Sequence, residues 1–330
     1  PKTESEDMIR KLAEAGMNIA RINMSHGTAE WTSMVMGRIK KASRNTQFPI
    51  GIMLDTQGPE IRTSATEYGL EVGDMFKIAV SSACDIQEGE KHTFVDYQNL
   101  INKVKKNDIV MIDNGLIALK VLDIGPYHIN CRVLNKGALG KTKSINMPGI
   151  RTDLPSVTDK DIRDLKLGAK LGIDYVAQSF VRRKEDILQM RKLLAKFKSS
   201  AMVIAKIEDQ EGVENMDEII NEADGVMVAR GDLGVEIPIE EIPLVQKQMV
   251  DKCIEAGKPV IIATHLLESM ITNPIPTRAE VTDVANAVFE KADCIMLSGE
   301  TTKGEYPVEC VSTMHRIAKS TQKRLNFNPG

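Results

Sequence analysis

Two short apolar runs in this chain end in charged residues. Residues 203–208 read VIAKIE and residues 226–232 read VMVARGD, and helical patterns flank both runs. Runs of this length are typical of the buried strands of a parallel sheet, whose carboxyl ends form the active site when the sheet is a barrel. Glu208 and Asp232 could together hold a hard divalent cation, and Lys206 would face the anion that this cation binds. Buried salt bridges are the alternative explanation for these charges.

Polar groups also end the two predicted strands nearest the N-terminus. Arg21 and Arg62 are permanent cations whose planar guanidinium suits phosphate. Asn23 and Ser25 are two residues apart, so they lie on one face of a strand, and Asp55 adds a carboxylate at the end of the next strand. Oxygens of this kind, with a backbone carbonyl, could bind a monovalent cation. Capping of the following turns explains these residues equally well.

Three later segments add groups to the same predicted rim. Gly231 and Gly234 flank an acidic residue, which allows a tight turn whose N–H groups point at an anion. Thr264 brings a hydroxyl group, and His265 beside it is either a ligand or proton carrier, or a histidine satisfied by hydrogen bonds. Residues 298–301 are expected to cap a helix and support the site.

The predicted rim therefore combines cations, metal-binding carboxylates and neutral oxygens. This combination matches a small substrate that is both phosphorylated and carboxylated, and it could stabilise charge on a moving phosphoryl group. The sequence contains neither a Walker A loop nor a kinase-type glycine loop, so phosphate binding would depend on a metal and on side chains. The residues that carry this prediction are Arg21, Arg62, Lys206, Glu208, Asp232 and Thr264, with Asn23, Ser25 and Asp55 beside them.

Alternating strands and helices must position these residues. The alternation predicts an α/β fold with a parallel sheet and right-handed crossovers. We expect a TIM (β/α)8-type barrel with seven strands visible in this chain, so the remaining strand would precede Pro1. The predicted strands are 17–23, 50–55, 175–180, 203–208, 225–230, 259–264 and 294–298. The predicted helices are 3–14, 30–43, 158–171, 184–197, 212–222, 240–256, 278–291 and 307–324.

One stretch breaks this alternation. From about residue 63 to residue 153, short runs of alternating apolar and polar residues are separated by turn-forming glycine, asparagine and proline. We therefore predict a barrel domain made of residues 1–62 and 154–330, with an inserted all-β domain made of residues 63–153. The inserted domain would form a hinged cap over the mouth of the barrel.

Composition narrows the class of protein. The chain has 330 residues, of which 42% are hydrophobic and only 4% aromatic, as in an aliphatic α/β core. Its net charge of −3 gives no reason to expect nucleic acid or an anionic membrane as a partner. Five cysteines without metal-ligand spacing indicate a reduced, intracellular protein. We find no signal peptide or membrane-spanning run and expect a cytoplasmic protein, with a plastid or other organelle form whose transit peptide has been removed as the alternative.

The segments at the predicted strand ends resemble those of the pyruvate kinase family, in the same order and over essentially the whole chain. The matching segments are ARINMSHG (20–27), LDTQGPEIR (54–62), DNGLI (113–117), IAKIE (204–208), MVARGDLG (227–234), ATHLLESM (263–270), PTRAE (276–280) and IMLSGE (295–300). The resemblance implies a TIM barrel with an inserted β-barrel domain. It also implies transfer of a phosphoryl group from phosphoenolpyruvate to ADP, giving pyruvate and ATP, the last step of glycolysis.

The resemblance further implies the ligands of two kinds of metal ion. Glu208 and Asp232 would bind Mg²⁺ or Mn²⁺, which would bridge the carboxylate and the phosphate of the substrate. Glu60 stands where members that require K⁺ carry glutamate, so dependence on K⁺ is implied. The implied K⁺ ligands are oxygens of Asn23, Ser25 and Asp55 and the carbonyl of Thr56.

The same resemblance assigns roles around the substrate. Lys206 would neutralise charge on the transferring phosphoryl group and on the enolate, and Arg21 would contact the phosphate. Backbone amides around Gly231 and Asp232 would take the substrate carboxylate. Thr264 would lie near the carbon that becomes the methyl group, where either its hydroxyl or a water molecule donates the proton. The implied substrate-binding residues are Arg21, Arg62, Lys206, Gly231, Asp232 and Thr264.

The chain departs from that family in a few places. Gln57 stands where many members have lysine, and His265 stands where glutamine or asparagine is usual. The family's first barrel strand and its C-terminal domain would fall outside these residues, so we expect an excerpt of a longer protein. The resemblance implies a homotetramer for the full-length form. A barrel without one strand exposes two sheet edges and should be prone to aggregation.

Two other functions remain open. A different metal-dependent barrel enzyme acting on pyruvate or its enol, such as a carbon–carbon lyase, would turn over without ADP. A catalytically inactive fragment or regulatory paralogue would bind ligands or partner subunits without turnover.

Overall fold

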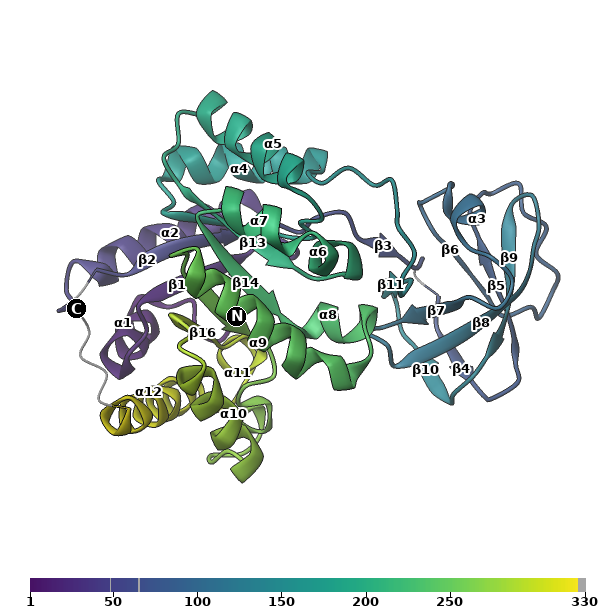
Figure 1. Cartoon of the computed structure of the whole chain (residues 1–330). Helices are drawn as coiled ribbons and strands as arrows, with labels where there is room; N and C mark the ends of the chain where they lie inside the picture. The colour runs from purple at the N-terminus through teal and green to yellow at the C-terminus, as the bar shows by residue number, and fades with distance from the viewer. Residues whose placement is uncertain (48, 65, 326–330) are drawn as a thin grey trace.

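The computed structural model describes residues 1–47, 49–64 and 66–325, which form a larger α/β part and a smaller β part (Figure 1). A parallel sheet of seven strands lies at the centre of the larger part, as the sequence predicts. The strands, in the order in which they pair, are β1 (Ile19–Asn23), β2 (Gly51–Asp55), β12 (Tyr175–Gln178), β13 (Met202–Ile207), β14 (Gly225–Ala229), β15 (Val260–Ala263) and β16 (Cys294–Met296).

Helices connect the successive strands and cover the outside of this sheet (Figure 1). Capping boxes at Thr158 and Thr277 start two of them, because each threonine accepts a hydrogen bond from the first helical turn. Among the described residues, no helix is both long enough and apolar enough to cross a membrane. The helices of the larger part are α1 (Glu6–Ala15), α2 (Ala29–Ser43), α4 (Asp159–Leu171), α5 (Lys184–Lys196), α6 (Gln210–Glu214), α7 (Met216–Glu222), α8 (Arg230–Glu236), α9 (Ile242–Glu255), α10 (Arg278–Phe289), α11 (Gly299–Thr302) and α12 (Pro307–Arg324), with the 3-10 helices η1 (Ile239–Glu241) and η2 (Glu268–Ile271).

The parallel sheet curls around an inner apolar layer. Alternate residues of each strand face inward, and Met53, Ile204 and Met227 belong to one small buried cluster. Ile19 on the edge strand β1 and Met296 on the opposite edge strand β16 both pack against that cluster. The two edges can share a cluster only because the sheet bends round as in a barrel. Outward-facing residues form a larger core with the helices, so the sheet is buried on both faces.

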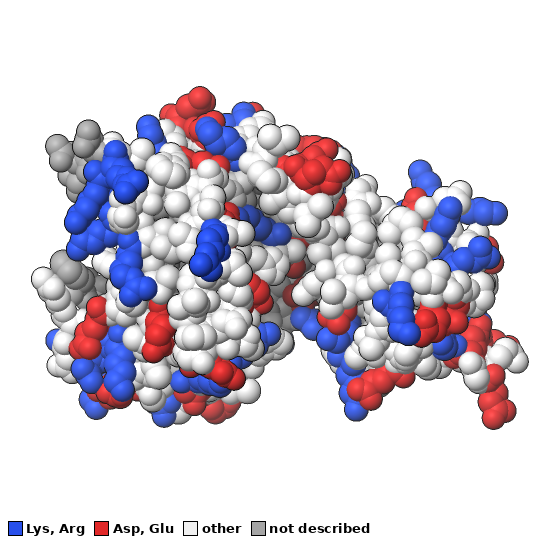
Figure 2. Space-filling view, turned by 90° about the horizontal axis from the view of Figure 1, so that it is seen from below, with Lys and Arg blue, Asp and Glu red and all other residues white. Residues whose placement is uncertain are grey.

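The insertion forms its own sheet and its own core. Neighbouring strands in this sheet are antiparallel, except for the pair β5 and β6. Figure 2 shows the insertion as a smaller lobe joined to the larger one by a narrower neck, with charges of both signs spread over this face. The strands, in pairing order, are β3 (Ile61–Arg62), β11 (Ser144–Asn146), β7 (Ile109–Ile112), β8 (Ile117–Ile124), β9 (His128–Val133), β5 (Met75–Ala79) and β6 (His92–Phe94), with a separate pair β10 (Gly137–Leu139) and β4 (Tyr68–Leu70) and one short helix α3 (Leu100–Lys103).

Two local predictions were wrong. The predicted helix 212–222 is two helices, α6 and α7, because Asn215 between them turns its side chain to donate to the carbonyl of Arg182 at 2.8 Å. The predicted tight turn at Gly231 and Gly234 is the helix α8. Neither glycine has a positive φ. Their absence of a side chain instead allows neighbouring elements to approach closely.

Two helix glycines allow the packing of the barrel to be tested. A Cβ atom on the buried Gly168 in α4 would lie 2.7 Å from Leu54 Cδ1 on β2, whereas a Cβ atom on the exposed Gly37 in α2 would meet nothing within 4 Å. We expect Gly168→Ala to lower the free energy of unfolding by about 1–3 kcal/mol through overpacking. Gly37→Ala should raise it by about 0.5–1 kcal/mol through helix propensity. Denaturant unfolding of both variants checks this, and equal effects would contradict the packing of α4 on β2.

Candidate active site

Several predicted site residues lie at or near the carboxyl ends of the barrel strands. Arg21 and Asn23 are two residues apart on β1, so they lie on the same face of the strand. Asn23 is paired in register with Asp55 at the end of β2. On β13, Lys206 follows Ile204, an inward-facing member of the apolar layer, by two residues. The period of the strand therefore places these polar groups directly above the inner apolar layer, at one end of the sheet.

Lys206 is the centre of this group. Its Nζ atom lies 2.9 Å from Glu208 Oε1, 3.1 Å from Asp55 Oδ1 and 2.7 Å from Ser179 Oγ. Burial alone would lower the pKa of Lys206, but the facing carboxylates of Asp55 and Glu208 raise this pKa well above its ordinary value. The ammonium group is therefore a permanent positive charge in a buried position.

Asp55 holds the negative charge that balances two cations. Its side chain is 1% exposed. Asp55 Oδ2 lies 2.5 Å from Arg21 Nε, and Asp55 Oδ1 lies 3.1 Å from Lys206 Nζ. Burial works to raise the pKa of Asp55, but Arg21 and Lys206 together hold this pKa below its usual value. The salt bridges that sequence reasoning left as an alternative are thus present, and they lie within the predicted site.

The buried Glu208 and the half-buried Asp232 form a pair of carboxyl groups close enough to affect each other's pKa. Burial and the neighbouring Asp232 carboxylate raise the pKa of Glu208 above its ordinary value, although Lys206 acts to lower it. Burial also raises the pKa of Asp232. The remaining oxygen of Glu208 accepts the N–H of Phe180 at 2.8 Å, and Phe180 has a φ of 52°, which is unusual for a non-glycine residue.

These two carboxylates fit a divalent cation by their chemistry. Adjacent carboxylates repel each other when both are ionised, and a cation between them would remove this repulsion. No group of three or more histidine, cysteine or acidic side chains in the described part of the chain could hold a metal ion. An ion bound to Glu208 and Asp232 would therefore need its other oxygens from a substrate, backbone or water.

The neutral oxygens proposed for a monovalent cation have other partners in this structure. Asn23 Oδ1 accepts the N–H of Ser25 at 3.0 Å, which is the turn-capping arrangement that the sequence left open. The Thr56 carbonyl accepts the hydroxyl of Ser179 at 2.7 Å. Carbonyl, amide, hydroxyl and carboxylate oxygens are the donors that a hard cation needs, so this set is chemically suited to K⁺.

Thr264 lies beside α8 in a left-handed backbone conformation. Its φ is 71° and that of His265 is 56°. A Cβ atom on Gly231 would lie 3.4 Å from Thr264 Oγ1, so the missing side chain at Gly231 lets α8 approach the threonine. Arg230 holds this arrangement, because its guanidinium donates to the Thr264 carbonyl at 2.7 Å and forms a two-point ion pair with Asp283 at 2.8 Å.

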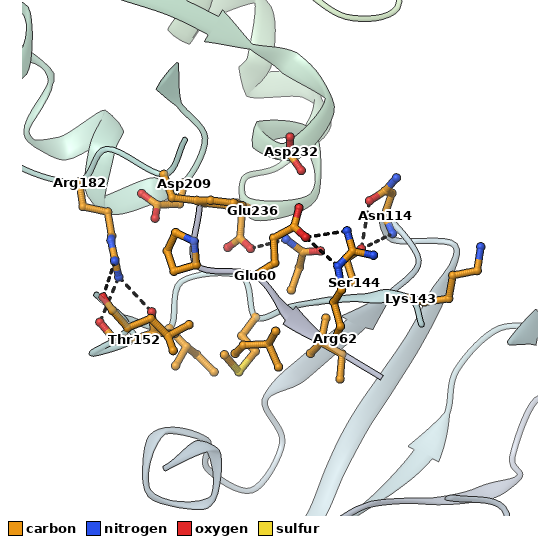
Figure 3. Close-up of a pocket in the computed structure, with 18 of the residues that line it drawn as sticks. Glu60, Arg62, Asn114, Lys143, Ser144, Thr152, Arg182, Asp209, Asp232 and Glu236 are labelled. Atoms are coloured by element: carbon orange, nitrogen blue, oxygen red, sulfur yellow. Dashed lines mark hydrogen bonds and ion pairs between the residues drawn. The ribbon is translucent and has the colours of Figure 1, made fainter. Parts of the chain in front are cut away.

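A cleft of about 520 Å³ lies between the end of the barrel sheet and the insertion (Figure 3). Asn23, Ser25 and Asp232 line it from the barrel, and Arg62 and Lys143 line it from the insertion. Figure 3 shows Asp232 on one side of this space and Arg62 with Lys143 on the other. Lys206 and Glu208 do not line the cleft themselves, but they are neighbours of Asp232, which does.

The predicted cation Arg62 is not in direct contact with the buried cluster. It pairs with Glu60 at 2.6 Å and donates to the carbonyl of Thr142 at 3.1 Å. It stands on β3, the first strand of the insertion's sheet, so its position depends on the insertion rather than on the barrel. Arg62 shares the cleft with Asp232.

The insertion is held near the barrel by contacts on both sides of the cleft. The buried Arg182 donates to Thr152 and to the carbonyl of Leu154, where the chain returns to the barrel (Figure 3). Asn146 on β11 donates to Glu236 on α8 at 2.9 Å. Burial raises the pKa of Glu236 to about 7.

Sequence reasoning missed three residues of this region. Ser179, Arg182 and Arg230 all make buried or half-buried contacts that position the site. Ser179 follows the inward-facing Ala177 by two residues, so the period of the strand would have placed it on the inner face. The contacts of Arg182 and Arg230 join segments far apart in the chain, and no local pattern indicates them.

Comparison with known proteins identifies the family. The family model described as "Pyruvate kinase, barrel domain" matches residues 1–311. The chain belongs to the pyruvate kinase family. Proteins named pyruvate kinase from Geobacillus stearothermophilus, Sporosarcina psychrophila and Staphylococcus epidermidis are 48%, 47% and 45% identical to it over 329, 334 and 329 residues.

These alignments cover 98%, 99% and 99% of this chain but 56% of each of the three pyruvate kinases. The chain thus spans about half the length of the relatives it matches. The family model covers both parts of the structure, the barrel with its charged cluster and the insertion that lines the cleft.

The raised pKa of Glu236 leads to a test of the cleft. Its ordinary value is 4.5 and its value here is about 7, so the folded state holds the proton more tightly than the unfolded chain. The associated stability is fully present below pH 4.5 and is lost as the pH rises through about 7. Glu236→Gln keeps an acceptor for Asn146 and removes the titration.

We expect the free energy of unfolding of Glu236→Gln, measured relative to the parent, to rise by about 1–3 kcal/mol as the pH increases from below 4.5 to above about 7. One pKa unit corresponds to about 1.4 kcal/mol, and the partial exposure of Glu236 reduces the effect. Denaturant unfolding across this pH range checks it. Glu255→Gln, at an exposed position of α9, is the control for removing one negative charge. If the free energies of unfolding of Glu236→Gln and the parent change equally with pH, the pKa of Glu236 is not raised by folding.

Proposed function

We propose that this protein is a phosphotransferase that moves the phosphoryl group of phosphoenolpyruvate to ADP, giving pyruvate and ATP at the end of glycolysis. The observation that carries the proposal is the buried Lys206 ammonium group held between Asp55 and Glu208, next to a cleft, in a chain of the pyruvate kinase family. A fixed positive charge at this place can stabilise negative charge that develops during phosphoryl transfer.

In this proposal Glu208 and Asp232 hold Mg²⁺ or Mn²⁺. When bound, the ion neutralises charge on the substrate phosphate and carboxylate and orients them. The pair is suited to this role because the two carboxyl groups are neighbours, and because Glu208 is buried while the half-buried Asp232 lines the cleft.

A K⁺ ion is proposed beside the phosphate. Asn23, Ser25, Asp55 and the Thr56 carbonyl would hold it. Support comes from the register of β1 and β2, which places Asn23 opposite Asp55, and from the all-oxygen character of the set.

The substrate would be held mainly by side chains and by the start of α8. Arg21, half-buried and already paired with Asp55, would contact the phosphate, and Arg62 would approach it from the insertion. The N–H groups of Gly231 and Asp232 lie in the first turn of α8, where backbone N–H groups have no intrahelical partner, and would bind the substrate carboxylate.

As the phosphoryl group leaves, Lys206 would hold its positive charge beside the phosphoryl oxygens and the enolate oxygen. The enolate carbon would then take a proton from the side of Thr264, whose hydroxyl donates to the carbonyl of Ala263 at 2.6 Å in this structure. Either this hydroxyl or a water molecule bound to it would be the donor.

The proposed substrates and partners of the whole protein are phosphoenolpyruvate, pyruvate, ADP and ATP. The proposed compartment is the cytoplasm, and the proposed assembly of the full-length form is a homotetramer. A metal-dependent carbon–carbon lyase and a catalytically inactive fragment or regulatory paralogue remain the alternatives. Pyruvate formation measured with and without ADP, Mg²⁺ and K⁺ separates the three, because a lyase needs no ADP and an inactive protein forms no pyruvate.

Lys206→Met tests the mechanism directly. It keeps most of the side-chain volume and removes the charge, so we expect kcat to fall by about 10²–10³-fold. Lys77→Met is the matched control, because Lys77 is also buried and ion-paired, at 2.7 Å from Glu90, but lies in the core of the insertion away from the cleft. Turnover of Lys206→Met close to that of the control would rule out the proposed role of Lys206.

A further inference from the structure

The hydroxyl group of Ser179 lies between Lys206 and the Thr56 carbonyl. Ser179 Oγ is 2.7 Å from Lys206 Nζ and 2.7 Å from the Thr56 carbonyl oxygen, and the residue is 2% exposed. The backbone N–H of Ser179 also donates to Thr56 Oγ1 at 3.0 Å. Both the backbone and the side chain of this serine are therefore tied to the end of β2.

The chemistry of these groups fixes the direction of the hydrogen bond between Lys206 and Ser179. A carbonyl oxygen only accepts and an ammonium group only donates. The Ser179 hydroxyl donates to the Thr56 carbonyl at 2.7 Å, and Asp55 Oδ1 at 3.4 Å is a more distant acceptor. With either acceptor, the hydroxyl presents a lone pair to Lys206. The serine is oriented to receive the ammonium group before any ligand binds.

Lys206 has three N–H donors and three acceptors: Asp55, Glu208 and Ser179. Two of these acceptors are carboxylates that the proposed cations also need. A carboxylate that binds a metal ion gives up negative charge to it and becomes a weaker partner for an ammonium group. Ser179 is the one acceptor of the three that neither proposed cation uses.

We propose that Ser179 is a positioning residue that keeps the Lys206 ammonium group in place when cations engage Asp55 and Glu208. The inference rests on the proposed function, because it concerns how Lys206 meets the substrate. With both cations bound, the bond to Ser179 holds Nζ at its place above the inner apolar layer. The other two N–H donors then become available to the phosphoryl and enolate oxygens.

The surroundings of Ser179 decide which substitutions can test this. A Cβ atom on Gly58 would lie 2.8 Å from Ser179 Cβ, and Gly58 has a φ of 72°, so the serine sits in a tight place. A larger side chain would disturb the packing. Ser179→Ala removes the acceptor, and Ser179→Cys keeps a side chain of similar shape but with a poor acceptor.

We expect kcat of both variants to fall by about 10–100-fold, because a hydrogen bond to a charged group is lost. The KM for phosphoenolpyruvate should change by less than about three-fold, because ground-state contacts of the substrate remain. Ser156→Ala is the matched control, since Ser156 is also buried and donates to Gln189 at 3.0 Å away from Lys206. It should keep the parent kcat.

Three kinetic results would overturn the proposal. The first is an unchanged kcat in Ser179→Ala, and the second is a raised KM with kcat intact. The third is recovery of kcat at high K⁺ concentration, which would mean that the serine acts through the cation pocket rather than through Lys206.

A second measurement does not depend on turnover. The side-chain ammonium signal of Lys206 in ¹⁵N NMR, assigned by its loss in Lys206→Met, reports whether Nζ is held by an acceptor. In the parent it should persist when Mg²⁺ and K⁺ are added, and in Ser179→Ala it should broaden or vanish. Loss of the Lys206 signal in the parent when both cations are added would refute the role of Ser179. If the parent keeps this signal but shows no turnover, the result contradicts only the proposed function.

Discussion

The structure depends on one group of buried charges, in which Lys206 lies between Asp55 and Glu208 above an apolar layer. Removing charges from water is costly, so such a group is stable only when each charge has partners. Arg21 balances Asp55, the Phe180 N–H and Lys206 satisfy Glu208, and Ser179 completes the ammonium group. These partners come from different strands or from the residues that follow them, so the charge balance depends on the order of the strands in the sheet.

The charged strand ends were predictable because the pattern is local. A buried strand with Lys206 and Glu208 on alternate positions has few explanations other than a site, and the period of two gave the shared face of Arg21 and Asn23. The break between α6 and α7, and the left-handed backbone of Phe180 and Thr264, come from contacts between distant segments, which a single sequence does not show. The family's roles for Asn23, Ser25, Asp55 and Thr56 as cation ligands stay predictions.

Arg230 shows that a charge at the end of a strand need not face a ligand. It belongs to the run 226–232, whose terminal charges predicted a site, yet its guanidinium donates to Asp283 and to the carbonyls of Ala263 and Thr264. It therefore acts as a link between α8, β15 and α10. Sequence can indicate that a charge lies at a site, but only the distances show whether that charge is available to a ligand.

The insertion also shapes how the barrel can fold. β2 must find β12, its neighbour in the sheet, although Asp55 and its partner Ala177 are far apart in the chain. Closing a long disordered loop costs entropy and slows folding. The insertion has its own core, and the first and last strands of its sheet along the chain, β3 and β11, pair with each other. Once folded, the insertion therefore brings Arg62 beside Ser144. The folded insertion then leaves only a short flexible connection between β2 and β12, which lowers the entropy cost of pairing them. The domain that lines the cleft in the native protein therefore also assists the folding of the barrel.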